Sequence, residues 1–65
     1  MKFAIYRKTG NRKKWRLFAT TSEASDARLI CVSVKEQAPG ETYGVLQTTD
    51  SPPVSLPASA GLMEF

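Results

Sequence analysis

Basic side chains crowd the start of the chain, and they are the residue types here with the clearest chemistry. Seven of the nine Lys and Arg residues lie within residues 1–16, and no acidic residue precedes Glu23. All six acids lie in residues 17–65 beside only two basic residues, so the net charge of +3 conceals a cationic start and an anionic remainder. Such an asymmetry bears on partners rather than on fold, and it predicts a surface that attracts phosphates or the carboxylates of another protein.

The predicted partner-binding surface combines basic residues near a hairpin tip with two aromatic residues beside them. Its members are Tyr6, Lys8, Arg12, Lys13, Lys14, Arg16 and Phe18. Lys and Arg neutralise phosphates and aromatic rings stack on unpaired bases, whereas Arg and aromatic residues also anchor contacts between proteins. A solvated strand face that protects the sheet edge is a third interpretation. No known nucleic-acid-binding motif is present, so we favour an acidic protein surface over naked nucleic acid as the partner.

Residues that perform catalysis or hold metals are scarce. The chain has no His, and its single Cys, Cys31, can form neither an internal disulfide nor a cysteine-based metal site. The acids are spread singly, and no glycine-rich phosphate loop or activated serine is present. We therefore predict a protein that is not an enzyme and uses no cofactor or metal. Cys31 is expected in the core rather than as a reactive thiol, because it falls on an apolar helix face without a His partner.

Two strands over residues 2–8 and 13–20 are predicted to form a hairpin around Thr9-Gly-Asn11, because Gly and Asn tolerate the positive φ angles of tight turns. Two registers are open at this hairpin. A two-residue turn would pair Tyr6 with Trp15 and would mix apolar and basic residues on both faces.

The second register, with a three- or five-residue loop, pairs Ile5 with Trp15 and Phe3 with Leu17. It places these four apolar residues on one face and Tyr6 with most of the basic residues on the other. We favour this register because a one-residue slip moves every side chain to the opposite face, and only here are the faces separated. Trp15 is then predicted to be a core residue rather than an exposed anchor, given the apolar area of its indole.

The segment between Thr20-Thr-Ser-Glu23 and Pro39-Gly40 is predicted to be a helix. Hydroxyl groups and an acid suit a helix start, and Pro-Gly suits a helix end. The β-branched residues within residues 29–35 leave a strand as the rival interpretation, but the start and stop signals favour the helix. Apolar residues recur at helical spacing; they are Ala24, Ala27, Ile30, Cys31, Val34 and Ala38.

A third strand is predicted over residues 42–49, and Pro52-Pro53 ends it because proline cannot donate a ladder hydrogen bond. The expected fold class is α+β, with a β-β-α-β domain over residues 1–49. Its three-stranded, antiparallel-type sheet has the first strand in the centre and one helix packed on one face. The other face of the sheet is then open and basic.

Residues 50–65 form a predicted Pro- and Ser-rich tail with an apolar end. We expect the tail to pack over Leu29 and Val32 on the outer side of the helix. The alternative is an exposed peptide that docks on a partner or mediates self-association with a second copy. No apolar stretch is long enough for a signal peptide or a membrane span, so the expected location is cytoplasmic.

The element order and two segments, Ala19-Thr-Thr-Ser-Glu-Ala24 and Ala38-Pro-Gly-Glu-Thr-Tyr-Gly-Val45, make the chain similar to the small podophage inhibitors of host RNA polymerase. Small anti-CRISPR proteins also resemble this build. The resemblance covers roughly residues 13–46 and carries over no functional residue. It implies a phage protein in the host cytoplasm that binds and blocks a nucleic-acid-processing complex, of the RNA polymerase or CRISPR effector type.

Overall fold

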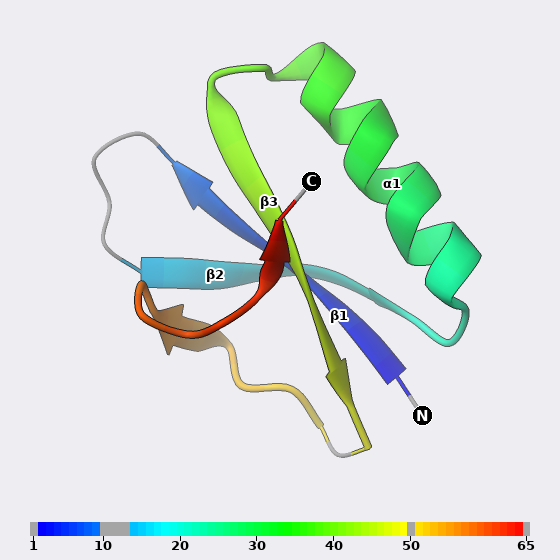
Figure 1. The fold of residues 1–65 in the computed structure, drawn as a ribbon, viewed down its shortest axis with the longest axis vertical. Coiled ribbons are helices and arrows are strands. Elements are labelled where there is room, and N and C mark those ends of the chain that lie inside the picture. Colours follow the sequence, from blue (N-terminus) through cyan, green and yellow to red (C-terminus); the bar gives the residue numbers. More distant parts are fainter. Residues whose placement is uncertain (1, 10–13, 50, 65) are drawn as a thin grey trace.

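A single antiparallel sheet and one helix make up the computed structural model, which describes residues 2–9, 14–49 and 51–64 (Figure 1). Across the sheet the strand order is β4-β2-β1-β3-β5. The α+β class and the central position of β1 between β2 and β3 are confirmed. The prediction of three strands is wrong, because the C-terminal segment adds two short ones. The elements are β1 (Lys2–Thr9), β2 (Lys14–Thr21), α1 (Ala24–Gln37), β3 (Glu41–Thr48), β4 (Ser55–Pro57) and β5 (Met63–Glu64).

The helix α1 confirms the predicted helix and excludes the rival strand over residues 29–35. Its apolar spacing outweighs the strand preference of β-branched residues, because that spacing lets Ala27 and Cys31 bury against the sheet. Beyond its C-terminus, the backbone N–H of Ala38 still donates to the carbonyl of Val34 at 2.9 Å. A turn at Pro39-Gly40 then leads into β3, as predicted.

The start of α1 differs from the expected hydroxyl cap. Glu23 is the N-cap residue, and its side chain makes no capping hydrogen bond. The Thr21 hydroxyl instead accepts a hydrogen bond from the Glu23 backbone N–H at 3.3 Å, one step before the helix. The predicted hydroxyl cap is wrong because β2 continues to Thr21 and uses that side chain in the strand-to-helix turn.

A β-bulge in β2 sets the register of the hairpin. Ile5 of β1 pairs with Ala19 and the next residue, Tyr6, pairs with Leu17, so Phe18 is an extra residue in β2. The predicted pairing of Ile5 with Trp15 is therefore wrong, as is that of Phe3 with Leu17. A bulge shifts the alternation of side chains by one position, which moves Leu17 and Trp15 to the face opposite Ile5. The predicted turn residues 10 and 11 lie outside the described residues.

The core on the α1 side of the sheet matches the prediction in part. Ile5, Ala27, Cys31 and Tyr43 form its buried cluster. The first three were expected there, whereas Tyr43 was not assigned to the core. The partly buried side chains packed around them are Phe3, Ala19, Ile30, Val34 and Val45.

The other side of the sheet carries a second core, so the prediction of an open basic face is wrong. Ala4, Tyr6 and Trp15 are buried in this core. Trp15 is thus a core residue as predicted, but it lies on the face away from α1. The side chains that cover it from the C-terminal segment are Leu56, Ala60 and Leu62.

The C-terminal segment, residues 51–64, completes the sheet. It runs along β2 as β4 and turns back to end beside β3 as β5 (yellow to red in Figure 1). Tyr6 donates its hydroxyl hydrogen to the Pro53 carbonyl at 2.7 Å, which ties the segment to β1. The expectation that it covers Leu29 and Val32 is wrong, since these side chains are 65% and 46% exposed. The segment packs on the sheet because this face presents two aromatic rings, Tyr6 and Trp15, that it can bury, whereas the outer face of α1 presents no aromatic ring.

Gly44 lies where the C-terminal segment crosses β3. A Cβ atom at this position would stand 2.9 Å from Leu62 Cβ and 3.2 Å from Trp15 Cη2. We expect Gly44→Ala to lower the free energy of unfolding by about 1–3 kcal/mol through overpacking, measured by urea denaturation. Gly40→Ala is the matched control, because no atom lies within 4 Å of its added Cβ. Equal unfolding midpoints for the two variants would show that the segment does not press on Gly44.

Candidate functional site

The predicted binding residues are divided between the two faces of the sheet. Tyr6 is fully buried beneath the C-terminal segment, so its assignment to an exposed binding face is wrong. Lys8 lies on the same side, with its Nζ 4.7 Å from the centre of the Trp15 ring. Arg16 and Phe18 belong to the α1 side, because the bulge and the alternation along β2 direct them there.

Lys14 is exposed at the start of β2. Arg12 and Lys13 lie outside the described residues. The structure therefore brings together only part of the predicted set, and it adds a residue that the sequence did not single out. That residue is Arg7 of β1.

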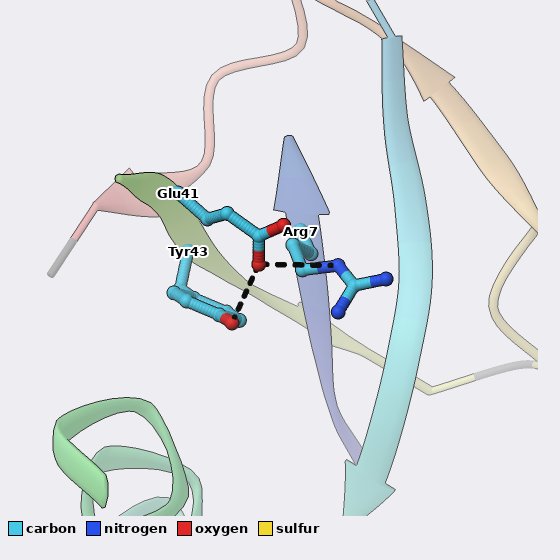
Figure 2. A network of polar contacts seen from close by, with 3 residues as sticks. All are labelled: Arg7, Glu41 and Tyr43. Carbon is cyan, nitrogen blue, oxygen red and sulfur yellow. Dashed lines mark hydrogen bonds and ion pairs between the residues drawn. The ribbon is translucent and has the colours of Figure 1, made fainter. Parts of the chain in front are cut away.

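Arg7 and Arg16 stand directly opposite each other on β1 and β2. Like charges in this arrangement repel unless an anion lies near them. Arg7 has such a neighbour, because its Nε lies 3.6 Å from Oε2 of Glu41 (Figure 2). Arg16 is exposed and has no acidic partner among the described residues. The cross-strand pair thus keeps an excess positive charge on Arg16.

An aromatic pair lies beside the two arginines. The Arg7 guanidinium carbon is 5.4 Å from the centre of the Phe18 ring, a cation–π geometry. The rings of Phe18 and Tyr43 meet edge to face, with centres 5.8 Å apart. Phe18 is 41% exposed while Tyr43 is buried, so one ring faces solvent and the other anchors it to the core.

Tyr43 also fixes the carboxylate that holds Arg7. Its hydroxyl donates a hydrogen bond to Oε2 of Glu41 at 3.1 Å, the same oxygen that faces Arg7 (Figure 2). Burial and then the bond to Glu41 raise the pKa of Tyr43, although Arg7 opposes the shift. The phenol therefore stays protonated at neutral pH and remains a donor. Glu41 follows the Pro39-Gly40 turn directly. This spacing is the only sequence signal that Glu41 lies at the start of β3.

Two surface hollows adjoin Arg16. One has a volume of about 290 Å³ and is lined by Arg7, Arg16, Leu17 and Phe18. The other has a volume of about 310 Å³, and its lining residues are Lys14, Arg16, Val54 and Ser55. Arg16 borders both, so an anionic group in either hollow would reach its guanidinium. We call the exposed basic and aromatic residues around these hollows the Arg16 surface; they are Arg7, Lys14, Arg16 and Phe18.

Cys31 is fully buried in the core, as predicted, and burial raises the pKa of its thiol. A thiol in this state is a poor nucleophile at neutral pH. Within residues 2–9, 14–49 and 51–64, no group of three or more His, Cys, Asp or Glu side chains is arranged to hold a metal ion.

No protein-family model, curated protein or solved structure matches this chain. In the part of the chain that the structure describes, no helix has the length and apolar character needed to cross a membrane.

Proposed function

We propose that this chain is a non-enzymatic binding protein whose Arg16 surface docks on an acidic surface of a larger protein. The observation that carries the proposal is the exposed Arg16, which stands opposite Arg7 without an acidic partner in the described part of the chain. A guanidinium group presents a planar set of donors that matches a carboxylate with two parallel hydrogen bonds. Phe18 beside it supplies the aromatic contact that is common at the centre of protein interfaces.

A protein partner accords better with this surface than single-stranded nucleic acid. Proteins that bind single strands stack successive bases on several aromatic rings. Tyr6 and Trp15 are buried, which leaves Phe18 as the exposed aromatic ring among the described residues. One exposed ring and a few cations are enough to contact a carboxylate-rich protein surface. A single ring is too few to stack successive bases of a nucleic-acid strand.

The resemblance to small phage inhibitors supports a proposal about which class of protein the partner belongs to. It points to a host nucleic-acid-processing complex, of the RNA polymerase or CRISPR effector type, bound stoichiometrically in the host cytoplasm. An inhibitor of this kind needs a stable surface and no catalytic group.

Reversing two charges on the Arg16 surface tests the proposal. Lys14 and Arg16 are both exposed, so Lys14→Glu with Arg16→Glu should leave the fold intact. We expect the double variant to bind purified RNA polymerase or CRISPR effector complex at least about tenfold more weakly than the original chain, because like charges then meet at the interface. Biolayer interferometry measures the affinities, and circular dichroism checks the fold.

The matched control reverses two basic residues elsewhere. Arg28→Glu with Lys35→Glu changes the net charge equally, but both residues are exposed on α1. Similar losses for the two double variants would mean that net charge, rather than the Arg16 surface, determines binding. Affinity of the original chain for naked DNA or RNA that falls steeply with salt would favour a nucleic-acid-binding module instead.

A further inference from the structure

The outer edge of β2 is covered along only part of its length. On the inner side β2 pairs with β1 from Arg16 to Thr21, while on the outer side β4 pairs with Lys14 to Arg16 alone (Figure 1). The last contact of the C-terminal segment with this edge is the bond from the Leu17 backbone N–H to the Val54 carbonyl, at 2.8 Å.

The chain leaves the edge at this point because Pro53 crosses to the face of the sheet, where its carbonyl accepts the hydrogen bond from Tyr6. Residues 18–21 therefore have a strand on their inner side and, within the described ranges, no strand on their outer side. Four residues of strand span roughly 13 Å, which is enough for a short added strand.

The uncovered edge lacks two of the features that usually prevent pairing with another strand, namely charge and proline. Proteins protect edge strands with charged residues, prolines or bulges. The sequence of residues 18–21 is Phe-Ala-Thr-Thr, without charge or proline, and Phe18 and Thr20 are exposed. A bulge is present at Phe18, at the end of the segment where the hollow lined by Arg7, Arg16, Leu17 and Phe18 begins.

We infer that an extended acidic peptide segment of the partner adds to β2 beside residues 18–21. This inference rests on the proposed function and names how the partner docks on the Arg16 surface. The main chain of the peptide pairs with the uncovered edge, which supplies affinity that is independent of sequence. An acidic side chain of the peptide enters the hollow at Phe18 and reaches Arg16.

The positive charge of the hollow favours an acidic peptide on this edge. The hollow presents two guanidinium groups, and Glu41 already contacts that of Arg7. A peptide with Glu or Asp at alternate positions would place its carboxylates on one face of the added strand, because side chains alternate along a strand. A basic peptide would set like charges against Arg16.

Nuclear magnetic resonance of the isotope-labelled full chain tests this inference. The probes are a short capped peptide of alternating Glu and Val, the same peptide N-methylated at alternate residues, and a peptide of alternating Lys and Val. We expect the Glu peptide to shift the amide signals of residues 18–21 and to slow their hydrogen exchange. N-methylation removes main-chain donors, so it should weaken binding about tenfold or more, and the Lys peptide should not bind.

The outcomes separate this inference from the proposed function. Equal binding of the Glu peptide and its N-methylated form, or no shift at residues 18–21 with millimolar peptide, would overturn edge pairing. The charge-reversal experiment on the protein partner would still stand in that case. Concentration-dependent shifts of the same amides without peptide would show a second copy on the edge and would also overturn the inference.

Discussion

Deleting residues 51–65 should unfold the domain, although the deletion leaves β1, β2, α1 and β3 complete. The segment covers Tyr6 and Trp15, which are both almost fully buried beneath it. Exposing one large apolar side chain costs about 1.5–3 kcal/mol, and a domain of this size has a total stability of only roughly 3–10 kcal/mol. Loss of β4 also uncovers the edge of β2 along its whole length.

Circular dichroism and thermal melting measure this effect. We expect the truncated chain to lack a cooperative transition, whereas the full chain unfolds in one step. Val54→Ala is the control within the segment, because Val54 is 73% exposed and its substitution should leave the melting temperature nearly unchanged. A truncated chain that melts like the full chain would show that the segment is a dispensable tail.

Trp15→Ala should cost nearly as much as the deletion. Trp15 is 2% exposed, and replacing a buried Trp by Ala removes about 3–5 kcal/mol of stability. Its side chain packs against the C-terminal segment and lies near Gly44, so the cavity would open at the centre of the second core. We therefore expect the Ala variant to be largely unfolded at room temperature.

Trp15→Phe separates apolar packing from the indole hydrogen. The Trp15 Nε1 is buried and has no hydrogen-bond partner among the described residues, so Phe loses volume but removes an unsatisfied donor. We expect Phe to retain most of the stability, as measured by urea denaturation followed by circular dichroism. An Ala variant with the unfolding midpoint of the original chain would contradict the burial of Trp15.

The second core and the proposed binding surface lie on different faces of the sheet. The side chains whose loss should unfold the protein lie beneath the C-terminal segment, while Arg16 and Phe18 lie on the α1 side. Charge reversal at Lys14 and Arg16 should therefore change binding without changing the melting temperature. The reverse holds for Gly44→Ala, which presses on the second core and leaves the Arg16 surface in place.

Local features of the sequence determined the elements and their order. The apolar spacing of α1 and the Pro39-Gly40 turn act within one segment, so they could be recognised without knowing its neighbours. The central place of β1 followed from the connection of a hairpin to a third strand through a helix. The concentration of basic residues at the start of the chain is likewise a property of the sequence itself.

Only the tertiary structure decided which side chains share a face. Phe18 is an ordinary strand residue in the sequence, yet as the extra residue of the bulge it moves Leu17 and Trp15 to the face opposite Ile5. A bulge is set by how two strands fit together, and a one-position shift reverses every later assignment.

The cover over the second face is equally a matter of tertiary structure. Residues 51–64 have little regular pattern, and they become ordered strands by pairing with β2 and β3. That pairing buries Tyr6, which the sequence placed among the binding residues. The pairing of β1 with β2 sets Arg16 opposite Arg7. The sequence thus determined how much basic charge the protein carries near its start. Long-range pairing decided where that charge meets solvent, because burial depends on which segments come together.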